Sequence, residues 1–301
     1  TTFISVPRLW LKFQQGVFAK MPPKKLERLL SIPILGKIVG RKVLKGLGLD
    51  HVLLAGSGSA PIPADLIQWY RRLGLNLVEG YAMTEDFAYS HNSTAEANAP
   101  GYVGVPMPGV EVRISDEGEI LIKSPGQMVG YYRAPELTAE AFTEDGFFRT
   151  GDRGERLPNG LLKITGRVKE LFKTAKGKYV APAPIENLLN AHPMVELSMV
   201  SGVGQPAAFA LVVPAESLRP KLDDPAVRRE VEQAMEQLLQ DVNAKLADYE
   251  QLRMIVIVRE PWSIENGTLT PTMKIRRNRI EEAVKDRIEP WFDAPKRVIW
   301  A

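Results

Sequence analysis

The spacing of apolar residues changes twice along this chain of 301 residues, and this change constrains the fold more than any other feature. Residues 7–49 have helical spacing, and a strand-like run over 51–55 leads through a Gly-Ser turn into an amphipathic segment over 64–73, a strand–turn–helix pattern. Apolar and polar residues alternate from 101 to 165, which predicts antiparallel strands. After residue 166, the order helix, strand, strand, helix, strand and helical tail is typical of an α+β domain.

We therefore predict a mixed α/β and α+β fold with two domains, in line with roughly 150 residues per domain. The large domain covers 1–168, with an α/β part to about residue 98 and an antiparallel β subdomain over 99–168. The small α+β domain covers 169–301.

Two local signals are especially clear. Alternating apolar residues over 110–114, a turn at Asp116-Glu117-Gly118 and a returning segment over 119–123 predict a β-hairpin. Asp224 followed by Pro225, ahead of apolar residues spaced by three and four, predicts a capped helix.

Composition excludes several classes of protein. Hydrophobic residues make up 45% and charged residues 25%, which is ordinary for a globular protein, and a net charge of +3 does not indicate a nucleic-acid partner. The chain has no cysteine, so disulfides and thiolate sites are excluded, and His51, His91 and His192 lack the spacing of zinc ligands. It has neither a signal peptide nor an apolar run of about 20 residues, and we expect a cytoplasmic protein.

Residues 7–49 combine helical spacing with many lysines and arginines. A basic amphipathic segment of this kind can contact a membrane surface peripherally. It is more often the solvated face of helices that cover a core. Both interpretations stay open at the level of the sequence.

Two clusters of small, hydroxyl and charged residues follow the predicted strand over 51–55 and a second short strand predicted over 75–78. The glycines of 56–61 allow close approach of a ligand, although such turns are common and no G-x-x-x-x-G-K-[ST] pattern is present. In the second cluster, Tyr81, Thr84 and Glu85 place a ring, a hydroxyl and a carboxylate where they can stack a base, bind phosphate and hold Mg²⁺. Alternatively, Thr84 caps a helix and Glu85 complements its dipole.

Two further clusters lie later in the chain. The segment 147–152 places Asp152 at a tight turn, where the carboxylate can accept hydrogen bonds from a ribose or form an ordinary Asx turn. The segment 166–178 carries basic residues that can bind an anion or form a solvated strand edge. These basic residues stand at positions 167, 169, 173, 176 and 178.

Taken in this order, the clusters resemble the motifs of the adenylate-forming superfamily of acyl-CoA synthetases, luciferases and peptide-synthetase adenylation domains. Within it, the chain is most similar to the long-chain fatty acyl-CoA synthetases. The segment Ser5–Trp10 also resembles a segment of these enzymes. The matching segments are Gly58–Pro61, Glu79–Glu85, Gly118–Thr138, Phe148–Asp152, Gly166–Glu170 and Leu269–Lys274.

The resemblance implies ATP-dependent activation of a fatty acid to acyl-AMP, followed by transfer to CoA, the reaction of an acid–thiol ligase. It implies that Lys274 bridges the α-phosphate and the substrate carboxylate, that Thr84 binds phosphate, and that Glu85 holds Mg²⁺. Tyr81 is expected to stack on adenine, while Asp152 and Arg167 are expected to bind the ribose, Arg167 alternatively a phosphate. The residues implied to surround the nucleotide are Gly58, Ser59, Ala60, Pro61, Glu79, Gly80, Tyr81, Ala82, Met83, Asp152 and Arg167.

The resemblance also implies a moving small domain. Lys169 takes the position of the hinge, and Gly177 lines the tunnel for the pantetheine of CoA. Lys176 and Lys178 beside it can meet the CoA phosphates or form a merely solvated basic face. Rotation about the hinge would present Lys274 and Gly177 in different steps of the reaction.

The sequence departs from the family pattern in two respects. No Ser/Thr/Gly-rich phosphate loop followed by Lys occurs, so we expect the chain to be about the C-terminal half of an enzyme, inactive without the N-terminal half. Position 169 is Lys where many relatives have Asp, a mark of the long-chain branch. Two alternatives stay open: a ligase that loads a carrier protein, and a non-catalytic nucleotide-binding or interaction module.

Overall fold

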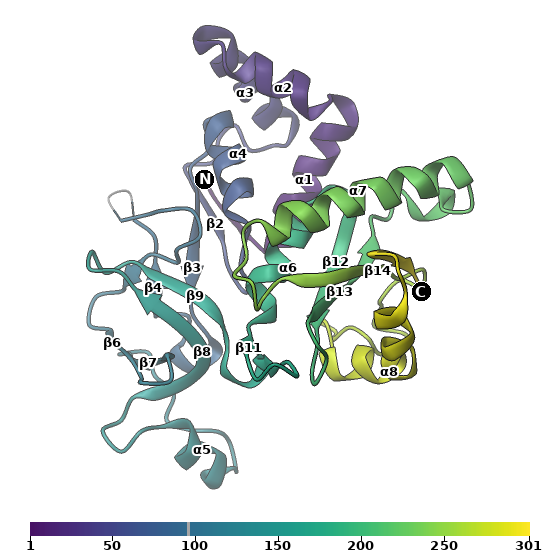
Figure 1. The fold of residues 1–301 in the computed structure, drawn as a ribbon. Helices are drawn as coiled ribbons and strands as arrows, with labels where there is room; N and C mark the ends of the chain where they lie inside the picture. Colours follow the sequence, from purple (N-terminus) through teal and green to yellow (C-terminus); the bar gives the residue numbers. More distant parts are fainter. Residues whose placement is uncertain (95–96) are drawn as a thin grey trace. The chain divides into compact units, whose positions relative to one another are not determined.

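A computed structural model describes residues 1–94 and 97–301 (Figure 1). The chain forms two compact units, Thr1–Val168 and Lys169–Ala301, each with its own hydrophobic core. The mixture of α/β and antiparallel β structure in the first unit, with an α+β second unit, confirms the predicted fold class.

A five-stranded sheet organises the first part of the first unit. Its strands follow the order β1-β2-β3-β4-β5, with β1, β2 and β3 parallel and β4 and β5 antiparallel. The strands are β1 (Thr2–Ser5), β2 (Leu54–Ser57), β3 (Leu77–Tyr81), β4 (His91–Asn92) and β5 (Val105–Pro106). The run over 51–55 was predicted as the strand, but the strand begins only at Leu54, which pairs with Thr2 of β1.

Four helices belong to this part of the unit: α1 (Pro7–Lys20), α2 (Pro23–Leu30), α3 (Pro33–Gly46) and α4 (Ala64–Leu73). Helices α1, α2 and α3 each have proline at their first position, where a missing N–H costs no hydrogen bond. Trp10 of α1 and Tyr70 of α4 are fully buried with ring centroids 5.0 Å apart. The Tyr70 hydroxyl donates to the Trp10 carbonyl at 2.6 Å, and Trp10 Nε1 donates to the Gly56 carbonyl of β2 at 3.3 Å.

An antiparallel sheet of order β6-β7-β8-β9 forms the second part of the first unit. Its strands are β6 (Glu111–Ile114), β7 (Glu119–Lys123), β8 (Phe148–Arg156) and β9 (Leu162–Arg167), and α5 (Pro135–Ala141) lies between β7 and β8. The β6–β7 hairpin confirms its prediction. The prediction that Asp152 lies at a tight turn is wrong, because Asp152 sits inside β8 and pairs with Arg167 of β9. The strand bulges against β7 between Arg149 and Arg153, which accommodates the left-handed Gly151 (φ +69°).

The second unit is a sheet covered on both faces. Strands β12 (Val195–Ser201), β13 (Ala208–Pro214), β14 (Leu252–Ile257) and β15 (Val298–Trp300) pair in that order. Helices α6 (Pro182–Asn190) and α7 (Pro225–Asn243) cover one face, and α8 (Arg277–Asp293) covers the other (Figure 1). Every residue of β13 is buried, as expected for a strand between two helical layers.

The ends of these helices follow local chemistry. Asp224 caps α7 as predicted, because its side chain accepts the Ala226 N–H at 2.8 Å. The tail was predicted to be helical from Lys274, but α8 begins at Arg277, after a turn over 269–275. A small hairpin of β10 (Phe172–Lys173) and β11 (Tyr179–Val180) precedes α6.

The edge strand β15 was not predicted. Its Trp300 is held by α7: the indole N–H donates to Glu232 at 2.6 Å, and the Arg228 guanidinium lies 4.6 Å from the ring centroid. The Ala301 N–H donates to the Ile257 carbonyl of β14 at 2.9 Å. Three residues carry too little periodicity to distinguish a strand from a loop, so this element depends on its tertiary partners.

Candidate functional site

Three of the sequence-predicted residues meet at the carboxylate of Asp152, which is 7% exposed. Asp152 of β8 and Arg167 of β9 are paired in register, and Arg167 Nε donates to Asp152 Oδ1 at 2.9 Å. Tyr81, the last residue of β3, donates its hydroxyl to Asp152 Oδ2 at 2.7 Å. The two sheets of the first unit thereby supply one hydrogen-bonded group, the Tyr81–Asp152–Arg167 cluster.

Burial shifts the pKa values of two rings at this cluster, those of Tyr81 and of the neighbouring His91. Burial raises the pKa of the Tyr81 phenol, and the Asp152 carboxylate raises it further, so the hydroxyl stays a donor. The His91 ring lies beside Tyr81, with centroids 6.1 Å apart, and burial lowers the pKa of His91 to about 4. Each Asp152 oxygen has a lone pair left for a further donor, such as the hydroxyls of a ribose.

The Gly-Ser turn lies against the buried side chain of Glu79 in β3. The Ile62 N–H donates to Glu79 Oε1 at 3.2 Å and thereby ties the end of the turn to the strand. Glu79 is 5% exposed, and this burial raises its pKa to about 7, although the backbone hydrogen bond from Ile62 acts in the opposite direction. Ser59 has a left-handed backbone (φ +68°).

Two buried polar atoms beside this turn lack a hydrogen-bond partner within the part of the chain that the structure describes: the Ser57 hydroxyl and Glu79 Oε2. Ser57 and Glu79 are register partners on β2 and β3. At Gly58, an added Cβ would meet only the Gly80 carbonyl, at 3.7 Å. The backbone at Gly58 carries no side chain, so a flat ligand such as an adenine can approach it closely.

The segment after Tyr81 forms a short 3₁₀ helix, Thr84–Asp86. Thr84 is its first residue and Met83 its N-cap, so the alternative in which Thr84 caps a helix is wrong. The capping carboxylate is Asp86, whose Oδ1 accepts the Met83 N–H at 3.0 Å. Asp86 was not among the candidates, although an acid three residues after the N-cap is a typical capping signal.

The carboxylate of Glu85 is half-buried and accepts a hydrogen bond from the Tyr131 hydroxyl at 3.0 Å. The Met128 N–H donates to the Glu85 carbonyl at 2.7 Å, which fixes the backbone. Mg²⁺ usually takes one or two carboxylates together with substrate phosphates and water. Glu85 beside the exposed Thr84 fits such a site, in which the nucleotide would supply the other ligands.

Lys274 stands in a tight turn of the second unit, between Leu269 and Ile275, which form an isolated bridge. The Lys274 N–H donates to Thr270 Oγ1 at 3.0 Å, and the Thr270 N–H donates to the Lys274 carbonyl at 2.8 Å. The preceding Met273 is held in the left-handed region (φ +64°). The Lys274 side chain is exposed, so its ammonium is available to a substrate.

Gly177 forms the tip of the β10–β11 hairpin. Its φ of +76° favours glycine, and its N–H donates to the Thr174 carbonyl at 2.9 Å. The neighbouring Lys176 and Lys178 are exposed. Lys169 begins the second unit, in the 3₁₀ helix Val168–Glu170.

Arg277 is a further residue that sequence reasoning missed. Its guanidinium donates to Glu186 of α6 at 2.8 and 3.2 Å and to the Val200 carbonyl at 2.9 Å, and it lies 3.8 Å from Glu170. Burial raises the pKa of Glu186, while Arg277 acts to lower it. Arg277 thereby ties the segment after Lys274 to α6 and to the residue that follows Lys169.

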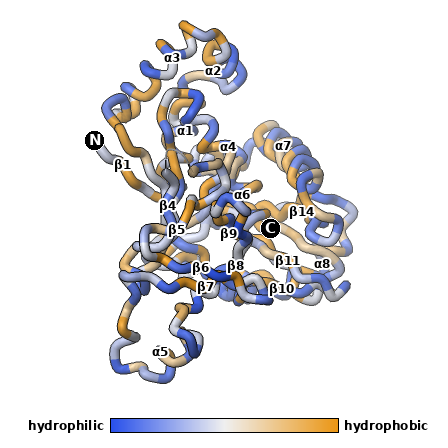
Figure 2. Tube along the Cα trace, turned by 90° about the vertical axis from the view of Figure 1, so that its left-hand side faces the viewer, coloured by the Kyte–Doolittle hydropathy of each residue, from blue (hydrophilic) through white to orange (hydrophobic). Residues whose placement is uncertain are grey.

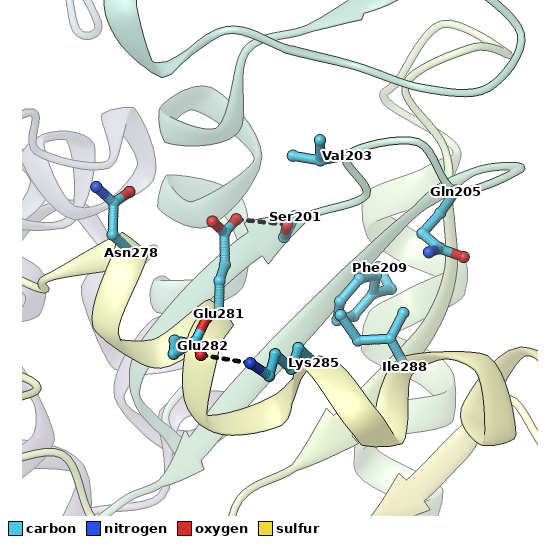
Figure 3. Close-up of a pocket in the computed structure, with 9 residues that line it drawn as sticks. All are labelled: Ser201, Val203, Gln205, Phe209, Asn278, Glu281, Glu282, Lys285 and Ile288. Carbon is cyan, nitrogen blue, oxygen red and sulfur yellow. Dashed lines mark hydrogen bonds and ion pairs between the residues drawn. The ribbon is translucent and has the colours of Figure 1, made fainter.

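A separate surface pocket lies between β12, the β12–β13 loop and α8 (Figure 3). Ser201 donates to Glu281 at 2.6 Å, and Lys285 pairs with Glu282 at 2.5 Å. The pocket is lined by Ser201, Val203, Gln205, Phe209, Asn278, Glu281, Glu282, Lys285 and Ile288. None of the sequence-predicted site residues is among them.

Comparison with known families matches both units. The family described as "AMP-binding enzyme" matches residues 1–132, and the family described as "AMP-binding enzyme C-terminal domain" matches residues 170–296. The chain is 35% identical over 276 residues to the long-chain-fatty-acid–CoA ligase FadD15 of Mycobacterium bovis, covering 86% of this chain and 45% of the relative. It is 34% identical over 289 residues to long-chain-fatty-acid–CoA ligase 1 of Cavia porcellus, covering 86% and 41%.

Solved structures with the same fold include adenylation domains. The adenylation domain of a carboxylate reductase from Mycobacterium chelonae has a TM-score of 0.73 at 27% identity, covering 97% of this chain and 46% of that chain. The AMP complex of an A-PCP didomain of a carboxylic acid reductase from Segniliparus rugosus has a TM-score of 0.74 at 28% identity, covering 97% and 41%.

The fold is that of the adenylation domains named above. The chain belongs to the AMP-binding, adenylate-forming family. It spans less than half the length of the relatives named above. Among the described residues, no helix is both long and apolar enough to cross a bilayer.

Proposed function

We propose that this chain is part of an enzyme that activates a long-chain fatty acid with ATP and transfers the acyl group to CoA. The observation that carries the nucleotide part is the Tyr81–Asp152–Arg167 cluster, a buried carboxylate held from two sides. The fatty-acid part is supported by the 35% and 34% identity to long-chain-fatty-acid–CoA ligases.

A carboxylate resists attack by a thiol because oxide would have to leave. In the proposed first step, a carboxylate oxygen attacks the α-phosphorus of ATP and pyrophosphate leaves, which gives an acyl-adenylate. In the second step, the CoA sulfur attacks the acyl carbon and AMP leaves, which gives the thioester. Negative charge develops on phosphate in both steps, so fixed cations and donors lower the barriers.

We assign the residues of the first unit as follows. Asp152 accepts the ribose hydroxyls, Arg167 adds a ribose or phosphate contact, and Tyr81 stacks on the adenine. Thr84 donates to phosphate oxygens, and Glu85 would hold Mg²⁺. When bound, Mg²⁺ supplies charge neutralisation between phosphate oxygens.

In the second unit, Lys274 neutralises the α-phosphate and the substrate carboxylate during adenylation, and Gly177 leaves room for the pantetheine chain. The proposed hinge is Lys169, where the second unit begins. Rotation about it would exchange the two poses.

Carboxylate-dependent ATP–pyrophosphate exchange tests the proposal in the full-length enzyme, with acids from two to eighteen carbons. We expect Lys274→Ala to lower exchange about a hundredfold or more, about 3 kcal/mol of barrier, and to affect thioester formation from added acyl-adenylate less. Lys245→Ala, which removes an exposed lysine of the same unit, is the matched control. Near-normal exchange in Lys274→Ala would refute the role of this lysine.

A second acceptor is favoured by the likeness to adenylation domains of carboxylic acid reductases, one of them solved with its PCP domain. In that case the acyl-adenylate would pass to a thiol on a carrier protein. Consumption of CoA during turnover separates the two functions. No exchange with any acid would instead favour a non-catalytic module.

A further inference from the structure

Helix α3 is fixed to its neighbours by two glycines. An added Cβ at Gly36 would lie 2.5 Å from the Leu30 carbonyl oxygen at the end of α2, and one at Gly40 would lie 2.5 Å from the Leu73 carbonyl oxygen at the end of α4. Such close backbone approach needs glycine at both positions. One face of α3 is therefore pressed against α2 and α4, and the opposite face is held outward.

The outward face begins with exposed apolar side chains. Ile34 and Ile38, one turn apart, are 79% and 60% exposed, and Ile32 and Leu35 are exposed beside them. We call these four residues the α3 tip. These four aliphatic side chains, close together at the start of α3, form one exposed apolar patch of the kind that marks interaction sites.

Positive charge is concentrated on α2 and α3, the helix before the α3 tip and the helix that carries it. Residues 7–48 contain ten lysines and arginines and one acidic residue, in a chain whose totals are 39 and 36. The single acid, Glu27, is paired with Arg72 at 3.3 Å. Figure 2 shows the hydrophobic and the hydrophilic segments alternating along α2 and α3. The exposed basic residues of the two helices are Lys24, Lys25, Arg28, Lys37, Arg41, Lys42 and Lys45.

We propose that the α3 tip and the basic residues around it bind the surface of an anionic lipid bilayer. Aliphatic side chains enter the boundary between headgroups and acyl chains, while lysines and arginines reach anionic headgroups. The near absence of acidic residues favours this surface over a protein partner, which would bring charges of both signs. Binding is peripheral and does not depend on the proposed ligase activity.

Co-sedimentation of the full-length protein with phosphatidylcholine vesicles, with and without one third phosphatidylglycerol, tests the proposal. We expect binding to the anionic vesicles that weakens with salt and is at least tenfold weaker for Ile34→Asp. Removing two charges with Arg41→Gln and Lys42→Gln should weaken binding by about fivefold for each charge.

Matched controls separate the site from general charge and hydrophobicity. Leu53→Asp changes an aliphatic residue that is even more exposed than Ile34 (90% against 79%) by the same charge. Lys221→Gln with Arg229→Gln removes one lysine and one arginine from the second unit. We expect both controls to bind like the unchanged protein. Equal loss in controls and variants, or no preference for anionic vesicles, would overturn the proposal. So would a change of oligomeric state in Ile34→Asp with unchanged vesicle binding, because the α3 tip would then join copies of the chain.

Discussion

Replacing Glu79 by glutamine should stabilise the first unit above neutral pH. Burial raises the pKa of this carboxyl to about 7 from its ordinary 4.5. An acid whose pKa is higher in the folded state binds its proton more tightly when folded, so its contribution is most favourable below pH 4.5. Stability is lost as the pH rises towards 7 and stays lower above it. At 1.36 kcal/mol per pKa unit, the loss reaches about 3 kcal/mol.

Glu79→Gln keeps the acceptor for the Ile62 N–H but cannot ionise. We therefore expect the variant to match the unchanged protein near pH 4.5 and to be more stable by up to about 3 kcal/mol at pH 8. Hydrogen exchange of peptides that span β2 and β3, compared between the two proteins at the same pH, reports the stability of this unit alone.

Glu119→Gln is the control, since Glu119 also accepts a backbone N–H, from Gly151 at 2.9 Å, but lies 3.5 Å from Arg149. Because Glu119→Gln loses this ion pair, the variant should be no more stable than the unchanged protein at pH 8. The reasoning is refuted if Glu79→Gln is no more stable than the unchanged protein at pH 8, or if its gain is the same at both pH values.

Two further substitutions test the candidate site and the lysine turn. Asp152→Asn should weaken AMP binding at least tenfold, about 1.4 kcal/mol, in calorimetry on the full-length protein. The control Asp145→Asn, which breaks an exposed ion pair with Arg113, should leave the affinity for AMP unchanged. If the Asp152 variant bound AMP as tightly as the unchanged protein, the ribose role would be contradicted. Met273→Gly should raise the melting temperature of the second unit by a few degrees, because a left-handed conformation costs a non-glycine residue about 1 kcal/mol. An equal rise in Met273→Ala would show that backbone strain is not the cause.

Elements with their own periodicity could be predicted from the sequence. The amphipathic segment 64–73 is helix α4 with those bounds, and the alternation over 110–123 is the β6–β7 hairpin. Strands β1 and β15 were missed because they are short edge strands, whose pairing is decided by residues far along the chain. In β8, Gly151 and Asp152 are typical of a turn, and the strand bulges there: residues 150–152 have no register partner on β7, while Asp152 pairs with Arg167 of β9.

In the candidate site, too, residues could be named from the sequence while their contacts could not. Family resemblance named Tyr81, Asp152 and Arg167, but their hydrogen bonds depend on two sheets that meet only in the folded unit. Arg277 could not be singled out, because it stands among other arginines and only the fold distinguishes the one that faces Glu186. The roles assigned to these residues stay predictions until nucleotide binding is measured.

The edge strand β15 has a practical consequence for protein production. Trp300 contacts Glu232 and Arg228 of α7, and the Ala301 N–H continues the hydrogen bonding between β15 and β14. Removing residues 298–301 from an expressed protein would uncover an apolar side of α7. A version that stops before Val298 would also expose the edge of β14 and invite aggregation, so the second unit should be produced with β15 included.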